Sequence, residues 1–174
     1  MNPVIESLVT RTSCRSYTDQ MPSREDLETI CRAGTHAPTG KNTQCPIIVA
    51  VTNKAIRDRM SRMNAQVMGV DSDPFYGAPV VLVVLADKAT GLTPVEDGSL
   101  VMGNMMNAAH ALGLGSCWIN RAREVFATDE GKALLKEMGI EGDYLGIGNC
   151  IVGYRATPAA PPRPRKEGRV RWID

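Results

Sequence analysis

Aromatic side chains, charge of one sign and long apolar runs are all scarce in this sequence, and each shortage argues against a class of protein. Aromatic residues make up 5% of the 174 residues, too few for a surface that stacks single-stranded nucleic acid. The 20 Lys and Arg residues almost balance the 19 Asp and Glu residues, so we expect no broadly basic face for nucleic acid or a membrane surface. The longest apolar run, residues 78–86, is far shorter than the roughly 18 residues of a membrane-spanning helix.

The sequence also lacks a cysteine pair of the kind that forms disulfides or metal sites. Its five cysteines are widely spaced and include no Cys-x-x-Cys motif: Cys14, Cys31, Cys45, Cys117 and Cys150. We therefore expect reduced, mostly buried thiols and no structural metal. Since no basic-then-apolar leader is visible at the N-terminus, we expect a cytoplasmic protein. A thiol-redox protein that uses Cys14 or Cys117 remains an alternative.

Motifs of nucleotide-binding and hydrolytic enzymes are absent or incomplete. Gly40–Asn42 resembles the end of a phosphate-binding loop, but Thr35 stands where its first glycine is required. Gly146–Ile151 begins like a dinucleotide-binding motif, yet it lacks the third glycine and is predicted as a strand. No Gly-x-Ser-x-Gly or His-Glu-x-x-His sequence occurs. His110 lies in an apolar helix, where we expect it to pack rather than to act as a base.

What the sequence does contain is the apolar content and periodicity of a globular domain. Hydrophobic residues make up 43% of the chain. We expect one domain over residues 1–174, in which 156–174 form a basic, proline-rich extension. Periodicity predicts helices over residues 3–9, 23–34, 54–70, 95–112 and 124–138, and strands over 47–52, 79–86, 116–119 and 144–152. Because small and apolar residues crowd the helix over 95–112, we expect it to be buried at the centre of an α+β fold.

Basic side chains alternate near both ends of the chain. Arg11, Ser13 and Arg15 would point the same way in extended backbone, because residues i, i+2 and i+4 share one face. Arginine binds phosphate through a bidentate fork, and a hydroxyl adds a compact donor. Arg163 and Arg165 repeat the i, i+2 spacing in the tail. The spacing indicates a local anion site; the alternative is two solvated basic stretches.

Three segments in order resemble the nitroreductase family of FMN-dependent oxidoreductases. They are residues 11–51, which begin RTSCRSY and contain APTGKNTQCP, residues 111–119 (ALGLGSCWI), and residues 151–168 (IVGYRATPAAPPRPRKEG). The resemblance covers nearly the whole chain. It implies a nitroreductase-like α+β fold, with a mostly antiparallel central sheet flanked by helices. It also implies a homodimer with FMN at the subunit interface.

The resemblance implies a set of cofactor-binding residues. Arg11 and Ser13 would bind the FMN phosphate together with Arg163 or Arg165, and Arg15 would reach the N1/O2 edge of the flavin, where reduction places negative charge. A loop over residues 38–44 would hold the ribityl chain and ring edge, and backbone N–H groups just after Trp118 would face flavin N5. The implied set is Arg11, Thr12, Ser13, Arg15, Pro38, Thr39, Asn42, Gln44, Trp118, Ile119, Asn120, Arg163 and Arg165.

The implied activity needs no catalytic side chain and no metal. NAD(P)H would deliver hydride to the flavin and depart, and a nitroaromatic, quinone or related acceptor would then take the electrons. Cys45, Ile47 and Arg121 depart from residues common in the family, where proline, tryptophan and glycine stand. Two alternatives share the flavin site: a storage or sensor module, and a related flavoenzyme such as a reductive dehalogenase or a flavin-cleaving enzyme. The sequence leaves open the acceptor and the choice between NADH and NADPH.

Overall fold

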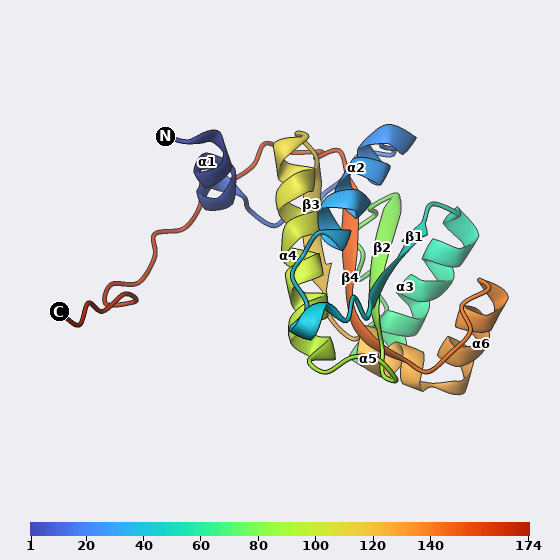
Figure 1. Ribbon diagram of the computed structural model, residues 1–174. Helices are drawn as coiled ribbons and strands as arrows, with labels where there is room; N and C mark the ends of the chain where they lie inside the picture. Colours follow the sequence, from blue (N-terminus) through green and yellow to red (C-terminus); the bar gives the residue numbers. More distant parts are fainter.

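A four-stranded antiparallel sheet forms the centre of the protein in a computed structural model that describes all 174 residues (Figure 1). The spatial order of the strands is β1-β2-β4-β3. Their bounds are Pro46–Val51 for β1, Val80–Asp87 for β2, Gly115–Ile119 for β3 and Tyr144–Gly153 for β4. Each predicted strand is present to within one or two residues, and the predicted α+β class is confirmed.

Helices cover both faces of the sheet, which explains the continuous apolar run in β2. Val80, Leu82 and Val84 pack into one core, whereas Val81, Val83 and Leu85 pack into the other, as the period of two requires. Residues 80–86 are all fully buried. The six helices are α1 Pro3–Thr10, α2 Arg24–Thr35, α3 Lys54–Met68, α4 Pro94–Ala111, α5 Ala122–Ala127 and α6 Asp129–Glu137.

Helix α4 lies against the sheet at its centre, together with α2, while α3, α5 and α6 cover the opposite face (Figure 1). Val101, Met102 and Met105 are buried against the sheet. The sheet comes unusually close to α4 at Gly98, where an added Cβ would stand 2.6 Å from Ile147. The central position of this helix is confirmed, but its burial is one-sided, because Leu100 is 48% exposed on the opposite face.

The predicted single helix over residues 124–138 is wrong, because the structure has two helices, α5 and α6. The break is at Thr128, whose backbone is extended and whose hydroxyl accepts a hydrogen bond from the N–H of Gly131. This is the geometry of a helix N-cap. Gly131 permits the sharp corner, since a Cβ there would lie 2.0 Å from the carbonyl oxygen of Val125.

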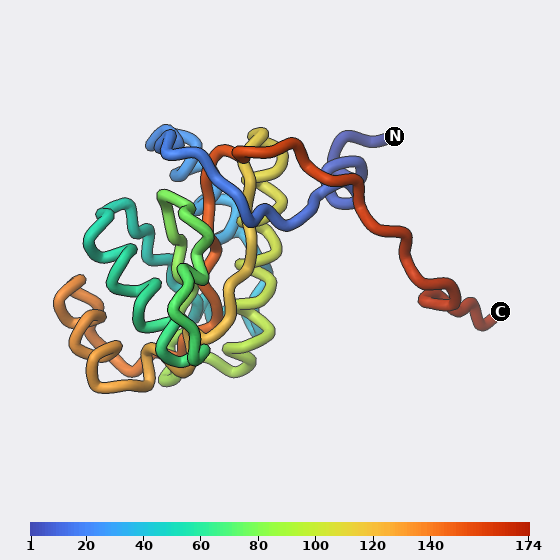
Figure 2. The backbone as a smooth tube through the Cα atoms, turned by 180° about the vertical axis from the view of Figure 1, so that it is seen from behind, coloured from blue at the N-terminus to red at the C-terminus, as the bar shows by residue number.

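Both ends of the chain stand away from the body. Figures 1 and 2 show α1 to one side, with the segment after β4 passing beside it and then leading outward. No residue of α1 is buried, and residues 156–174 are all exposed and form no helix or strand. No helix in the protein has both the length and the apolar composition required to cross a bilayer.

The loop between α3 and β2 is held by one carboxylate. Asp73 accepts hydrogen bonds from the backbone N–H groups of Phe75 and Gly77, both at 2.8 Å, and from Arg57 at 2.6 Å. The Ser61 hydroxyl also donates to it. Burial alone would raise the pKa of Asp73, but these hydrogen bonds outweigh it and hold the pKa below its usual value.

Asp73→Asn is expected to lower the free energy of unfolding at pH 7 by about 1–2 kcal/mol, because the variant loses charged hydrogen bonds at a partly exposed site. A carboxylate whose pKa is lowered by folding stabilises the protein above its unfolded pKa, and that stability is lost as the pH falls through the folded pKa. Urea denaturation should therefore show a difference between the two proteins that shrinks below pH 3.8. A difference that stays constant down to pH 2 would contradict this role.

Candidate functional site

The predicted arginine segment runs as extended chain beside the sheet. The N–H of Cys14 donates to the Ser116 carbonyl at 2.9 Å, and Tyr17 forms a β-bridge with Arg155 at the end of β4. Cys14 is 3% exposed and faces inward, whereas its neighbours Ser13 and Arg15 are exposed. The backbone therefore presents alternate side chains outward, as the i, i+2 spacing requires.

Three basic groups from distant parts of the chain gather beside residues 10–12. Arg155 donates from Nη2 to the carbonyl of Thr12 at 2.7 Å, and Nε2 of His110 lies 2.9 Å from the hydroxyl of Thr10. Nη1 of Arg11 is buried and has no hydrogen-bond partner. Burial and the nearby charges of Arg155 and Arg11 lower the pKa of His110.

No carboxylate neutralises this cluster, because neither Arg11 nor Arg155 takes part in an ion pair. Unpaired guanidinium groups, one with an orphaned buried donor, make a site that favours an anion. Sequence reasoning missed Arg155. Its position directly after the Gly153–Tyr154 pair of the closing segment was the only signal that could have pointed to it.

A pocket of about 190 Å³ lies next to the arginine segment. It brings together four residues of the predicted set, namely Arg15, Trp118, Ile119 and Asn120. The Asn120 carbonyl accepts a hydrogen bond from Asn64 at 2.8 Å, which fixes the end of β3. Nε1 of Trp118 is buried without a partner. The remaining lining residues are Met68, Ser72, Asp73, Pro74, Tyr76, Cys117 and Arg121.

Arg121 has a φ of +76°, in the left-handed region that favours glycine. Glycine is common at this position in the family. The arginine of this chain therefore stands on a strained backbone at the edge of the pocket. Strain of this kind persists only where the surrounding structure holds it, and it gathers at functional sites. Cys14 and Cys117 are 3% and 2% exposed, so neither is accessible as a redox thiol.

The loop over residues 38–44 has an unusual backbone and does not reach this pocket. Lys41, Asn42 and Gln44 all have φ between +50° and +55°. Thr39 accepts a hydrogen bond from the backbone N–H of Gln44 at 3.0 Å. The loop lies near the start of α4, whereas residues 11–17 run along the other side of the molecule (Figures 1 and 2). Within one chain, Arg15 therefore lies apart from Pro38, Thr39, Asn42 and Gln44.

The tail arginines are likewise not brought to the site within one chain. Arg163 and Arg165 are exposed and make no hydrogen bond or ion pair with other residues. They lie on the extended segment that leads away from the body (Figure 2).

A buried carboxylate holds the 38–44 loop in place. Asp97, 3% exposed in the first turn of α4, accepts the Gly40 N–H and the Thr93 hydroxyl, both at 2.9 Å. The Cys45 thiol lies 3.5 Å from its other oxygen. Burial and this neighbouring carboxylate raise the pKa of Cys45, so the thiol stays protonated and can donate.

Asp97→Asn is expected to loosen the loop and to weaken binding of any ligand that contacts it by about tenfold, because an amide keeps one acceptor oxygen and loses the charge. FMN titration of the variant is the measurement. Asp87→Asn, a change to the half-buried carboxylate that caps the turn after β2, is the matched control. Unchanged affinity in Asp97→Asn would show that the loop does not contact the ligand.

The strand order, the central helix and the extended basic segment beside the sheet together define a nitroreductase-type α+β protein. The solved nitroreductase with bound FMN from Bacteroides fragilis NCTC 9343 superposes over 100% of both chains with a TM-score of 0.91, at 24% identity. An FMN-dependent nitroreductase from Clostridium difficile R20291 shares 26% identity over 98% of this chain and 99% of that one, with a TM-score of 0.82.

The model of the Nitroreductase family matches residues 8–154. The FMN reductase (NAD(P)H) of Bacillus subtilis strain 168 is 31% identical, over 95% of this chain and 70% of that protein. The chain belongs to the Nitroreductase family, and the resemblance seen in the three sequence segments is confirmed.

Proposed function

We propose that the protein is a cytoplasmic, homodimeric, FMN-dependent oxidoreductase that uses NAD(P)H to reduce nitroaromatics, quinones or related acceptors by a ping-pong mechanism. The observation that carries this proposal is the unneutralised basic cluster around Arg11, placed beside the pocket that Arg15 and Trp118 line. Names of the relatives support it: one is called an FMN reductase (NAD(P)H) and another an FMN-dependent nitroreductase.

The residues present fit FMN in both of its chemical parts. A phosphate dianion would neutralise Arg11 and Arg155, and it would supply the acceptor that the buried Nη1 of Arg11 lacks. Ser13 adds a hydroxyl from the exposed side of the same segment, and Arg163 or Arg165 would add a further guanidinium once the tail is held. The flat ring would enter the pocket beside the segment Trp118–Asn120 at the end of β3.

Each protein group has a definite task around the ring. Arg15 would place a cation at the N1/O2 edge, which would favour the reduced cofactor over the oxidised one. Backbone N–H groups just after Trp118, near Asn120, would face N5, and the hydrogen bond from Asn64 to the Asn120 carbonyl holds that backbone in place. When bound, FMN supplies the hydride acceptor. The chain itself binds, orients and excludes water, which is why no acid–base constellation is needed.

The site is completed by a second copy of the chain in this proposal. The pocket of about 190 Å³ is small for a three-ring system, and the loop with Thr39, Asn42 and Gln44 lies on the other side of the molecule. A two-fold axis would bring that loop of one subunit to the pocket of its partner.

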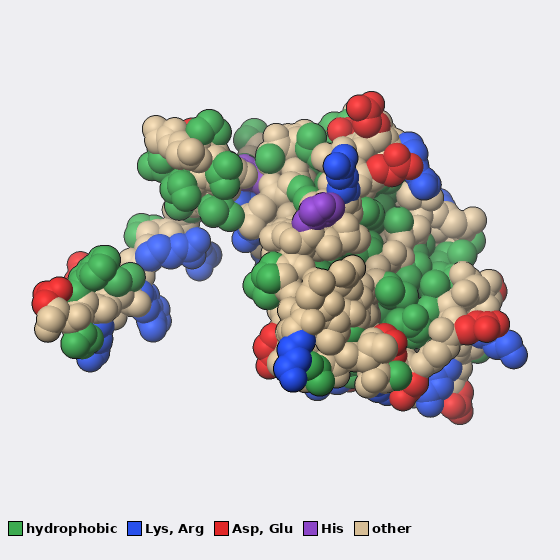
Figure 3. Space-filling model, viewed as in Figure 1, with side chains coloured by type: hydrophobic (Ala, Val, Ile, Leu, Met, Phe, Trp, Pro, Cys, Tyr) green, Lys and Arg blue, Asp and Glu red, His purple; other side chains and the backbone are tan.

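Exposed apolar surface supports the same arrangement. Figure 3 shows hydrophobic side chains gathered on α1, where Val4, Ile5, Leu8 and Val9 are 49–66% exposed. In the tail, Trp172 is 84% exposed. Monomeric proteins rarely expose such a set of apolar side chains, so we infer that α1 and the tail pack on the partner subunit.

Visible absorbance under anaerobic conditions tests the proposed function. The purified protein, supplied with FMN, is expected to show a flavin spectrum that bleaches on addition of NADPH or NADH and returns on addition of a quinone. A spectrum that persists in excess nicotinamide nucleotide would favour the storage or sensor module. Recovery only with a halogenated aromatic acceptor would favour a dehalogenase.

A further inference from the structure

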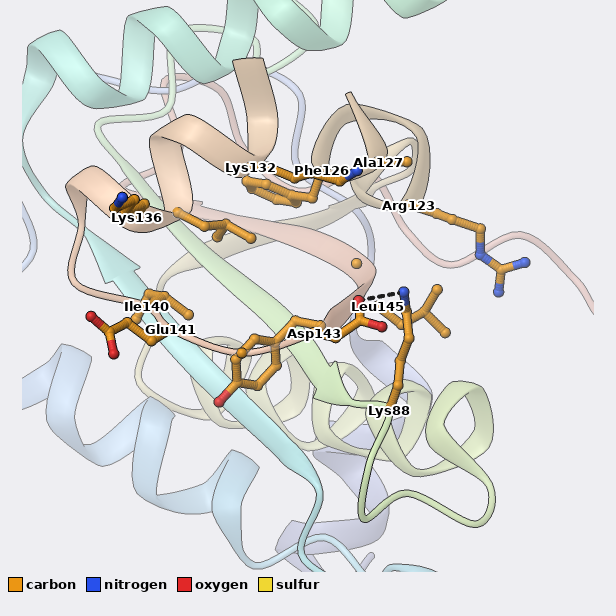
Figure 4. A pocket seen from close by; sticks show the side chains of 14 residues that line it. Lys88, Arg123, Phe126, Ala127, Lys132, Lys136, Ile140, Glu141, Asp143 and Leu145 are labelled. Carbon is orange, nitrogen blue, oxygen red and sulfur yellow. Dashed lines mark hydrogen bonds and ion pairs between the residues drawn. The ribbon is translucent and has the colours of Figure 1, made fainter. Parts of the chain in front are cut away.

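A second, larger cavity lies away from the arginine segment, between β4, the end of β2 and the corner formed by α5 and α6 (Figure 4). Its volume is about 660 Å³, within the range of about 300–1,000 Å³ that small-molecule sites have. It contains none of the residues that the sequence predicted for FMN. We call it the α5–α6 cavity.

Unpaired cations surround the α5–α6 cavity. Lys132 and Lys136 are one turn apart on the same face of α6, and Arg123 comes from α5. None of these three takes part in an ion pair. Lys88 is paired with Asp143 at 2.6 Å, which leaves Glu141 as the only other acidic side chain in the lining. Figure 4 shows Lys136 and Arg123 at opposite ends of the hollow.

Apolar groups form the inner wall of the cavity. Phe126 and Leu135 are 4% and 6% exposed, and Ile140 and Tyr144 are half-buried beside them. Gly146 lets the start of α5 pack directly on the strand at the edge of the cavity, because a Cβ there would lie 2.2 Å from the Ala122 carbonyl oxygen. An apolar wall with three unpaired cations at its margin suits a ligand with a flat ring and attached phosphates.

A third hollow, of about 410 Å³, lies between the α5–α6 cavity and the proposed flavin pocket. That middle hollow shares Arg123 and Gly146 with the α5–α6 cavity. It shares Trp118, Asn120 and Arg121 with the pocket that contains Arg15. The three hollows are therefore neighbours, with Arg121 and Arg123 lining the middle one.

We propose that the α5–α6 cavity binds the adenosine-phosphate end of the nicotinamide nucleotide. The adenine lies against Phe126 and Tyr144, the phosphates meet Arg123, Lys132 and Lys136, and the middle hollow leads the nicotinamide to the flavin pocket. This inference rests on the proposed function, since it names the site that recognises the reductant. It also provides an anionic partner for Arg123, Lys132 and Lys136, which form no ion pair within the chain.

Equilibrium binding of adenosine 5′-diphosphate, the part that NADH and NADPH share, tests the site directly. Isothermal calorimetry on the FMN-loaded protein is expected to show binding that weakens about tenfold in the double variant Lys132→Ala, Lys136→Ala, because two exposed charge contacts are lost. The control is Arg24→Ala, Arg32→Ala, which removes the same charge from exposed positions on α2. Absence of binding to the wild type, or equal weakening in both double variants, would overturn the site.

Reduced nicotinamide mononucleotide, which lacks the adenosine phosphate, separates this inference from the proposed function. In anaerobic stopped-flow experiments, the double variant on α6 is expected to raise the apparent Kd for NADPH about tenfold and to leave that for the mononucleotide unchanged. If both nucleotides are affected alike, the cavity does not hold the adenosine end. If neither nucleotide reduces the wild-type protein, it is the proposed oxidoreductase function that fails.

Discussion

Arg11→Gln is expected to lower the affinity for FMN by about a hundredfold, which corresponds to about 3 kcal/mol for the lost charged hydrogen bonds. Nη1 of Arg11 is buried without a partner, and the guanidinium group of Arg155, which forms no ion pair, donates to the carbonyl of Thr12 beside it. In the ligand-free protein, burial of this guanidinium nitrogen without a hydrogen-bond partner therefore already costs free energy. A phosphate would repay that cost, and glutamine cannot replace the interaction because it carries no charge and no fork.

The measurement is the flavin content of the purified variant, followed by calorimetric titration with FMN. Arg24→Gln, an exposed arginine on α2 in an i, i+4 pair with Glu28, serves as the control for loss of one positive charge. We expect the control to bind FMN as the wild type does. If Arg11→Gln also retains FMN, the basic cluster is not the phosphate site. Parallel variants Arg163→Gln and Arg165→Gln would show which tail arginine takes part.

Leu8→Glu is expected to dissociate the dimer and to release FMN, the second large effect that the structure predicts. Leu8 is 49% exposed on α1, where no residue is buried within the chain. In the proposed dimer this side chain is covered by the partner, so a carboxylate would have to be buried there without a counter-ion. The cost is several kcal/mol, which corresponds to a rise of at least about a hundredfold in the dimer dissociation constant.

Analytical ultracentrifugation across a concentration series would measure the assembly state of this variant. Val67→Glu places the same charge on the exposed side of α3, where the side chain is 40% exposed, and should remain dimeric. Loss of FMN should follow loss of the dimer, because the 38–44 loop is proposed to come from the partner. A wild-type protein that sediments as a monomer with FMN bound would contradict the shared site.

Most of the fold could be predicted from the sequence because the apolar run of β2 and the small residues of α4 are strong signals. The apolar run of β2 is buried on both faces, so its length directly marks the strand. The small residues of α4 mark close contact with the sheet, as at Gly98 against Ile147. The break at Thr128 was missed, since a threonine inside an amphipathic pattern reads as a helical residue unless the close approach of Gly131 to Val125 is known.

The candidate site could be predicted only where its residues lie in segments that resemble the family. Arg15 and the residues around Trp118 meet in one pocket, as their segments implied. Arg155 contacts the Thr12 carbonyl from 143 positions away, and nothing local to either residue indicates that pairing. The 38–44 loop could be recognised from its residues, but its position relative to Arg15 depends on the packing of whole elements and, in our proposal, on a second subunit.

Fluorescence titration of the flavin-free protein with FMN and with riboflavin tests the central claim most directly. The two ligands share the ring and the ribityl chain, and only FMN carries the phosphate. The account predicts one FMN per chain, with riboflavin bound at least about a hundredfold more weakly because Arg11 and its basic neighbours then lack their anion. Equal affinity for the two flavins, or no quenching with FMN at all, would contradict it.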